Sequence, residues 1–515
     1  MMKKIFLTTL IGMCVMPMAA QETYEVGEIA TQDLNGTARY VGMGGAMEAL
    51  GADISTMSTN PAGIGLFRKS QVSASMSVLS QAGESSFASA NKTYVSFDQI
   101  GFVISNRISR KGFINVGFNY HKSRNFNQIL SVVDRLDGAS QSKLTYDKFF
   151  FGVITSNEDL TYAQPDVLYH EGLYDTNLIL DDGSFNGDAY PFSGSDYRFN
   201  RGNTGYIGEY DFNLSGNIND RVYLGLTFGF HDVHYHGYSV YDENVQSNPL
   251  NLNTATLEDS RDVTGTGFDI KVGTVIRPVE ESPFRFALYI NSPIFYSLKS
   301  LNRTGLRLNG QYYADENPRH DEYRYDFRTP WKFGVSLGHT VGTDFAFGAS
   351  YEYSDYSAAD ARIKAGESYD WYRDVYYSNT KHDNAMNDHI KETLKGVHTL
   401  KVGAEFKPIP EMAIRAGYNF LSPMYKHDAY RGVAVESLGN YYSSETDYTN
   451  WKATHRITAG IGLTFGHFKA DMAYQYSLKK GQFLPFAGSS DDNLPFDIEV
   501  KNNRQQVLLT LGYTF

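Results

Sequence analysis

The chain has 515 residues, a formal net charge of −12 and a single cysteine. An acidic chain is a poor partner for nucleic acid, whose phosphates require a basic surface. One cysteine excludes disulfide bonds within the chain and zinc sites built from several thiolates.

Residues 1–20 have the pattern of a secretory signal peptide. Lys3 and Lys4 precede an apolar run, and small residues end it, so we expect cleavage before Gln21. The run is shorter than the ~20 residues that a membrane-spanning helix needs. Cys14 lies inside this segment without the small residue that a lipoprotein signal has just before its cysteine, so we expect no lipid anchor.

The next segment, residues 21–68, is dominated by small residues from Ala38 to Phe67. Glycines allow unusual backbone angles and close approach, so this stretch suits a confined space. Seven glycines fall within the thirty residues from 36 to 65, namely Gly36, Gly42, Gly44, Gly45, Gly51, Gly63 and Gly65. In Asn60-Pro61-Ala62-Gly63 the proline fixes its own φ and favours an extended Asn60, which predicts a rigid turn.

This segment also resembles a known family. The run Gly42, Gly44-Gly45-Ala46, Ala49, Gly51, Asp53, Ser55-Thr56 and Asn60-Pro61-Ala62-Gly63 is similar to the N-terminal hatch of the FadL family of outer-membrane transporters. The resemblance implies a hatch inside a fourteen-stranded barrel and passive uptake of hydrophobic molecules such as long-chain fatty acids. It implies hatch or gating roles for Asn60, Pro61, Ala62, Gly63, Asp53 and Phe67.

Residues 69–515 alternate between apolar and polar side chains in fourteen segments. Alternation with period two, many tyrosines and no long apolar run are typical of a membrane β-barrel, in which one face of each strand touches lipid. We therefore expect an all-β, fourteen-stranded antiparallel transmembrane barrel. The strands are expected at 72–78, 100–104, 114–120, 206–214, 222–230, 268–272, 284–290, 331–337, 345–353, 400–406, 412–420, 457–465, 468–476 and 507–515.

Short and long connections alternate along the chain, as periplasmic turns and extracellular loops do in such barrels. This pattern puts both chain ends on the periplasmic side. The expected long loops are 122–204, 241–260, 299–322, 357–395, 421–452 and 479–502. A soluble β-sandwich or propeller does not predict this alternation. Phe515, at the end of an alternating strand, resembles the signal that the barrel-assembly machinery recognises.

The remaining motifs do not predict a metal site or a catalytic site. Strand alternation separates His231 from His234 and His236, so these three cannot form one metal triad, and we expect no metal or other cofactor. The acidic runs 181–188 and 321–326 do not have EF-hand spacing. No G-x-S-x-G motif is present, so we expect no enzyme. Residues 22–26 resemble the box of energy-coupled receptors, but those receptors have 22 strands and a larger plug.

The expected protein is a monomer in outer-membrane lipid that takes up a hydrophobic small molecule. The resemblance implies that the hatch shifts and opens a sideways exit near a kink in the third strand, for which Gly112 and Gly117 are candidates. Loops 241–260 and 299–322 are polar and acidic, which leaves open a general porin or a surface adhesion or receptor barrel.

Overall fold

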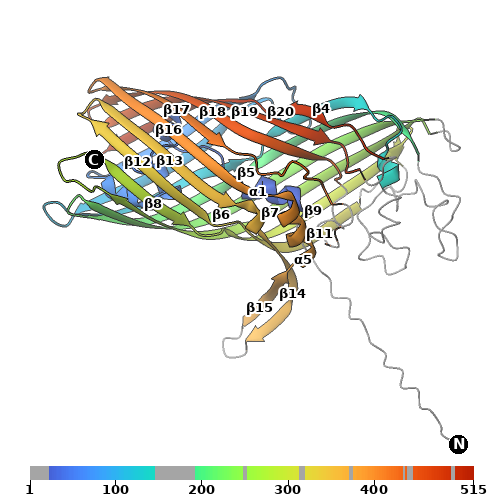
Figure 1. The fold of residues 1–515 in the computed structure, drawn as a ribbon, viewed down its shortest axis with the longest axis horizontal. Helices are drawn as coiled ribbons and strands as arrows, with labels where there is room; N and C mark the ends of the chain where they lie inside the picture. The colour runs from blue at the N-terminus through green and yellow to red at the C-terminus, as the bar shows by residue number, and fades with distance from the viewer. Residues whose placement is uncertain are drawn as a thin grey trace, which may run out of the picture.

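The computed structural model describes residues 22–144, 192–246, 252–312, 319–370, 375–432, 435, 437, 445–488 and 493–515. The expected signal peptide and the acidic run 181–188 lie outside the described residues. Within the described ranges the chain forms a closed antiparallel barrel with 14 strand positions, which confirms the expected fold class (Figure 1).

The wall follows chain order. Its strands are β1 (Gln71–Gln81), β2 (Thr93–Arg107), β3 (Phe113–Asn125), β5 (Gly194–Ile218), β6 (Val222–Val245), β7 (Thr254–Ile276), β8 (Arg285–Asn291) continued by β9 (Phe295–Leu308), β11 (Arg319–Arg328) continued by β12 (Lys332–Val341), β13 (Phe345–Asp355), β16 (Gly396–Ile409), β17 (Met412–Leu421), β18 (Tyr448–Phe465), β19 (Phe468–Leu484) and β21 (Arg504–Thr514). β1 pairs with β21 from Gln71–Thr514 to Gln81–Arg504, which closes the barrel and leaves no free edge.

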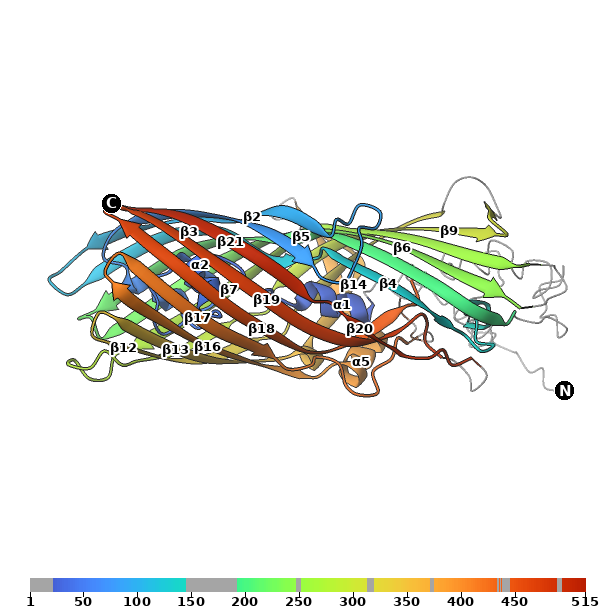
Figure 2. The same cartoon turned by 90° about the horizontal axis from the view of Figure 1, so that it is seen from above.

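Short strands extend the wall. β4 (Gln128–Arg135) pairs with β5, β10 (Gln311–Tyr312) with β9, and β20 (Ile498–Lys501) with β19. The hairpin of β14 (Asp360–Asp370) and β15 (Val375–His382) projects away from the barrel (Figure 1). The short turns 108–112, 219–221, 277–284, 342–344, 410–411 and 466–467 gather at the end where Phe515 lies (Figure 2).

An apolar band surrounds the barrel next to the short turns. On β6 the outward side chains Leu224, Phe228 and Phe230 are 52%, 41% and 47% exposed, whereas inward Thr227 is buried. Lys401, Glu405 and Arg415 are buried inside, as alternation predicts. The outer surface is therefore suited to lipid and the lumen to polar groups.

Beyond this band the polarity of the wall reverses. Past Phe230 the outward positions of β6 are Asp232, His234 and His236, while Val233 and Tyr235 are buried inside. An outward polar face requires water, so this part of the barrel extends out of the apolar band as a tube with an apolar interior. We call this part the upper chamber.

The reversal explains why strands continue into segments expected to be loops. β5 and β6 run through parts of 122–204 and 241–260, because the alternation persists there with its polar face outward. The same holds for β9 and β11 in 299–322, β18 in 421–452 and β19 in 479–502. Segment 357–395 holds η3 (Tyr356–Ala358) in part, the β14–β15 hairpin and α5 (Asn384–Thr393). The expected pattern requires an apolar outward face on each strand, so it does not predict strands whose outward face is polar.

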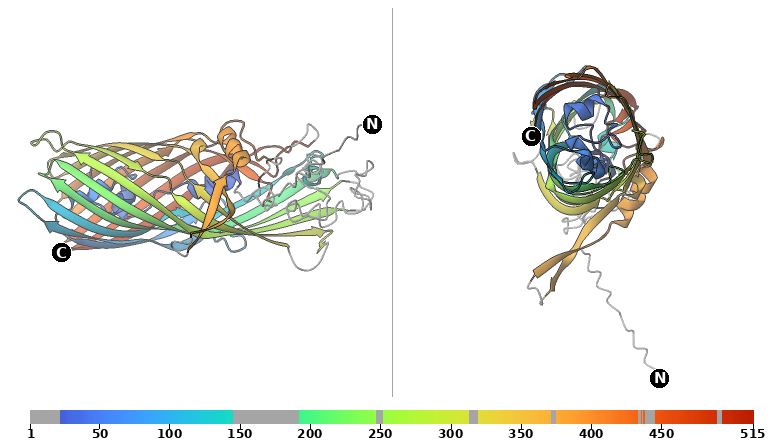
Figure 3. Two further views of the ribbon diagram at one scale, coloured as in Figure 1. Left: turned by 90° about the horizontal axis from the view of Figure 1, so that it is seen from below. Right: turned by 90° about the vertical axis from the view of Figure 1, so that its left-hand side faces the viewer.

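The N-terminal segment 22–67, which we call the plug, lies inside the barrel (Figure 3). Its elements are α1 (Thr23–Ala30), α2 (Ala38–Gly42), η1 (Ile54–Ser58) and η2 (Pro61–Leu66). Every residue of the plug is buried or half-buried. Among the described residues, none of the helices combines the length and apolar character of a transmembrane helix.

Candidate functional site

The turn at Asn60 ties the plug to itself and to the wall. Asn60 is fully buried and caps η2, where its Oδ1 accepts from the Ala62 amide at 3.2 Å. Its Nδ2 donates to the Glu48 carbonyl at 2.8 Å and to the Thr274 carbonyl of β7 at 3.5 Å. The predicted turn is therefore both a local cap and a contact to the barrel.

The rest of this turn packs against β5 and β6. The Pro61 carbonyl accepts from Ser215 Oγ at 2.8 Å and from Asn213 Nδ2 at 3.3 Å. Ala62 is fully buried in a cluster that contains the ring of Tyr223 and several smaller apolar side chains. The Gly63 amide donates to the Asn60 carbonyl at 3.1 Å, which closes the turn.

Asp53 and Phe67 stabilise the ends of the plug's short helices. Asp53 caps η1 by accepting from the Ser55 amide at 3.0 Å, and both of its carboxylate oxygens accept from Thr37 Oγ1 at 2.8 and 2.9 Å. The Phe67 carbonyl accepts from Ser105 and Asn115 side chains at 3.1 and 3.2 Å. Both residues therefore connect separate parts of the plug or the plug and the wall.

The two glycines proposed for a strand kink have other positions. Gly112 precedes β3 and belongs to the turn 108–112, where its carbonyl accepts from the Ile108 amide at 3.0 Å. Gly117 lies in a regular ladder between β2 and β5, and the Met57 side chain of the plug occupies the space next to its Cα. The irregularity of β3 falls instead between Lys122 and Arg124.

This bulge in β3 is held by the plug. The Asp33 amide donates to the Ser123 carbonyl at 2.8 Å, and Asp33 Oδ2 accepts from the Asn125 amide at 2.9 Å. Arg124 forms ion pairs with Glu28 at 2.6 Å and with Asp33 at 3.4 Å. Although burial by itself would raise the pKa of Asp33, Arg124 and Arg456 hold this pKa below its ordinary value of 3.8.

β2 and β3 separate at the height of this bulge. Their ladder begins at the pair Gln99–His121, although β2 continues to Thr93 along β1 and β3 continues to Asn125 along β5. Only side chains are seen to bridge this gap among the described residues. Lys122 Nζ donates to Ser96 Oγ at 2.9 Å, the Tyr94 hydroxyl donates to Asn125 Oδ1 at 3.1 Å, and Asn35 Nδ2 donates to Asp98 Oδ1 at 3.2 Å and to the Lys122 carbonyl at 3.1 Å.

Two cavities lie on either side of the plug segment 33–35. The larger, of about 140 Å³, lies between α1, this segment and the inner face of β16–β18. Its walls include the apolar groups of Leu421, Met424 and Trp451 and the amines of Lys332 and Lys479. The smaller, of about 60 Å³, lies behind the β2–β3 gap and contacts Asp98 and Lys122. Asp33, Leu34, Asn35, Arg456 and Lys479 contact both cavities.

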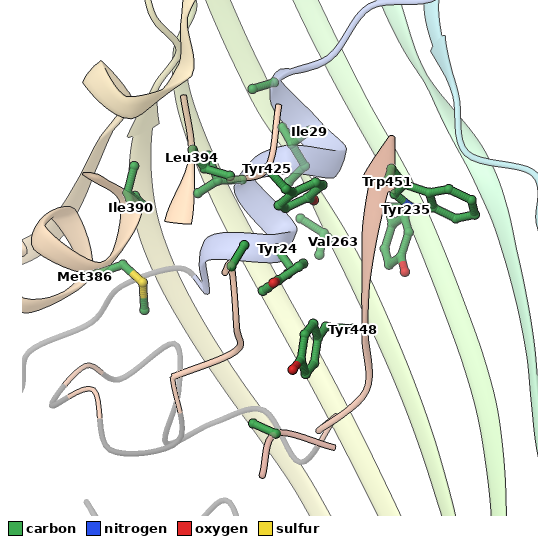
Figure 4. Packing of buried hydrophobic residues seen from close by; sticks show 14 of the residues in the cluster. Tyr24, Ile29, Tyr235, Val263, Met386, Ile390, Leu394, Tyr425, Tyr448 and Trp451 are labelled. Carbon is green, nitrogen blue, oxygen red and sulfur yellow. The ribbon is translucent and has the colours of Figure 1, made fainter. Parts of the chain in front are cut away.

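α1 lies in the upper chamber, above the larger cavity. Glu22 caps it by accepting from the amides of Tyr24 and Glu25. The Tyr24 ring stacks on Tyr425 at 5.0 Å between centroids and lies 5.1 Å from Tyr448 (Figure 4). Residues 22–26, which resemble a receptor box, are thus buried in this aromatic cluster.

Buried ion pairs join the plug to the wall in the apolar band. Lys401 of β16 lies 2.8 Å from Glu48 of the plug and 2.9 Å from Glu352 of β13. Arg39 of the plug lies 3.1 Å from Glu405, which also pairs with Arg415 at 2.7 Å. The lumen at this level is therefore polar and is filled by the plug.

No family profile matches the sequence, and no curated protein matches it in sequence. A FadL homologue from Pseudomonas aeruginosa is similar in structure, with a TM-score of 0.52 and 13% identity over 94% of this chain and 100% of its own. The Ralstonia pickettii toluene transporter TbuX and the CymD monoaromatic hydrocarbon channel each have a TM-score of 0.47 and 11% identity, over 94% of this chain and 99% of theirs. The chain therefore has the fold of a FadL-type barrel.

Proposed function

We propose that this protein is an outer-membrane barrel for the passive uptake of hydrophobic small molecules, with the plug acting as a hatch. The observation that carries the proposal is that the plug fills the lumen while the barrel wall has a gap between β2 and β3. Buried ion pairs and the Asn60 turn block the straight route through the apolar band, while β2 and β3 part beside the smaller cavity. A molecule that cannot pass straight down needs a sideways exit.

The larger cavity has a mixed polar and apolar lining, which suits a ligand with one apolar and one polar part. A dry apolar cavity of about 150 Å³ holds a molecule the size of benzene, so 140 Å³ suits one ring or a short length of chain. Lys479 lies 4.7 Å above the Trp451 ring, and Lys332 donates to Gln32 at 2.5 Å. Neither amine has a carboxylate partner within salt-bridge distance among the described residues, so both suit the acidic end of a fatty acid.

The proposed exit is the β2–β3 gap. Val95 and Phe97 on the outer face of β2 are 67% and 40% exposed beside it, so lipid would receive an apolar molecule there. Movement of the segment 33–35 would join the two cavities and release the β3 bulge. The proposal involves no catalytic step, places the protein as a monomer in outer-membrane lipid, and keeps exposed Phe515 as the residue for the barrel-assembly machinery.

A cross-link across the gap tests the exit. Once the expected signal peptide is removed the chain has no cysteine, so the pair Ser96→Cys and Lys122→Cys can be joined by a short bifunctional maleimide. We expect cells with an intact lipopolysaccharide leaflet to lose uptake of a labelled long-chain fatty acid when this pair is cross-linked. The control pair Ile104→Cys and Val116→Cys lies in the intact ladder of the same strands and should keep uptake.

Conductance separates this function from that of a porin. The intact protein in a planar bilayer should pass few ions, and deletion of residues 31–67 should raise conductance strongly. If the intact protein conducts as freely as the deletion variant, the transporter proposal is wrong. If the cross-linked protein still takes up the fatty acid, the β2–β3 exit is wrong.

A further inference from the structure

A second cluster of polar side chains lies in the lumen beside the larger cavity. His121 of β3, Glu209 and Asp211 of β5, His231 of β6, and Asp269 and Lys271 of β7 are each less than a tenth exposed. Lys271 Nζ lies 2.8 Å from Glu209 and 2.9 Å from both Asp211 and Asp269. Three carboxylates thus face one ammonium, which leaves two negative charges in excess when the imidazoles are neutral.

Such an excess is unfavourable away from water, because buried charges need partners of opposite sign. The geometry identifies where the partner is missing. Glu209 Oε2, Asp211 Oδ2 and His231 Nδ1 have no hydrogen-bond partner among the described residues. Glu209 Oε2 lies between two imidazole nitrogens, at 3.7 Å from His121 Nε2 and 3.8 Å from His231 Nδ1.

These separations are too long for hydrogen bonds but close to those of atoms that share a metal ion. Ligands bound to tetrahedral Zn²⁺ at about 2.0–2.1 Å lie about 3.3 Å apart. One donor atom each from His121, Glu209 and Asp211 lies within 4.8 Å of the others. His231 Nδ1 is not one of these three mutually close atoms, but it lies 3.8 Å from Glu209 Oε2, so rotation of its side chain would bring it to the same ion.

The surrounding contacts orient both imidazoles. His231 Nε2 lies 3.3 Å from Asp269 Oδ1, so Nδ1 points toward Glu209. A carboxylate on the far nitrogen is the usual support of a metal-ligating histidine. His121 Nε2 lies toward Glu209, while its Nδ1 lies 3.3 Å from Asn119 Nδ2 and 3.9 Å from Asp211 Oδ2. His121 also lines the larger cavity, which gives an ion a route to the cluster.

We propose that His121, His231 and Glu209, with Asp211 as the fourth ligand, bind one divalent transition-metal ion such as Zn²⁺. Two imidazoles and carboxylates are a common zinc donor set. The ion would supply the two missing positive charges and would join β3, β5 and β6 at the base of the larger cavity. This inference is independent of the transport proposal.

Zinc binding to the full chain tests the site. The protein, purified without a histidine tag, is stripped with a chelator, incubated with Zn²⁺, desalted and analysed for bound metal. We expect one Zn²⁺ per chain, and Co²⁺ should give the visible absorption of a tetrahedral site. His231→Gln and Glu209→Gln should weaken binding at least tenfold, and Asp269→Asn, which keeps all four ligands, should weaken it about 10–100-fold.

The matched control is the double variant His234→Gln and His236→Gln, on the outward face of the same strand, which should still bind one Zn²⁺. Heat-dependent gel mobility verifies that each variant forms a folded barrel. If the unsubstituted protein binds no Zn²⁺, the metal site is wrong. Loss of zinc in the control together with retention in His231→Gln would equally refute it.

Discussion

Single glycines of the wall decide how closely the plug approaches it. A Cβ on Gly225 would collide with the backbone of Pro61, one on Gly348 with the Ala46 carbonyl, and one on Gly403 with the Met43 carbonyl. In most strands a glycine only weakens the sheet, but here it admits a second backbone. The plug is therefore fitted to the wall at β6, β13 and β16.

Gly225→Val should displace the plug. Overpacking of this kind costs about 1–3 kcal/mol, which is about 5- to 150-fold in the population of displaced states. We expect a higher ion conductance and faster proteolysis near the Asn60 turn. Gly512→Val is the control, because a Cβ there meets no atom closer than 3.5 Å. Equal conductance in the two variants would contradict the fitted contact.

At the scale of elements, β3 and the segment 33–35 form one unit. Asp33 satisfies the backbone groups that the bulge at Ser123 leaves unpaired and compensates the charge of Arg124. The same segment separates the two cavities. Its position therefore sets both the closure of the β2–β3 gap and the connection between the cavities.

This contact should resist moderate acid. A depressed pKa means that the stabilisation by the Asp33 carboxylate is complete above its ordinary value of 3.8 and is lost as the pH falls through the lower folded value. We expect fatty-acid uptake at pH 5 to equal that at pH 7. Asp33→Asn should loosen the gap at pH 7, seen as faster thiol labelling of Ser96→Cys. Asp137→Asn, in an exposed turn, should leave labelling unchanged.

At the scale of the whole molecule, the barrel has two parts along its axis, the apolar band and the upper chamber. In the apolar band the wall is apolar outside and carries charged side chains inside, and the plug supplies residues of opposite charge such as Glu48 and Arg39. In the upper chamber the wall is polar outside and encloses an apolar core around Tyr24 and α1. Plug and wall are therefore joined by ion pairs in the apolar band, and in the upper chamber by apolar packing together with ion pairs such as Glu28–Arg124 and Glu25–Arg261.

Substitutions that remove one charge at a time test the ion pairs between the plug and the wall. Lys401→Met leaves Glu48 and Glu352 without their common cation, and an unpaired buried charge costs about 3–5 kcal/mol. Glu48→Gln leaves the Lys401–Glu352 pair intact, so its effect should be smaller. The free energy of unfolding of the detergent-solubilised barrel in urea measures both. A larger loss in Glu48→Gln would contradict the arrangement.

The sequence by itself determined the barrel. Lipid outside and polar groups inside impose a two-residue period on every strand in the apolar band, so strand number, turn order and the inward side of Lys401, Glu405 and Arg415 were readable along the chain. Local chemistry also determined the Asn60–Gly63 turn, because proline geometry and side-chain capping act over a few residues.

Tertiary structure decided what depends on contacts between distant residues. Gly117 matched the idea of a kink, yet the register placed the irregularity at Ser123, where the partner is Asp33. The sequence separated His231 from its neighbours His234 and His236, as the structure confirms, but only the pairing of β5 with β3 and with β6 brings His231 beside His121 and Glu209. Strand periodicity fixes the face of a side chain, whereas the partners on that face depend on strand register, which no short stretch of sequence specifies.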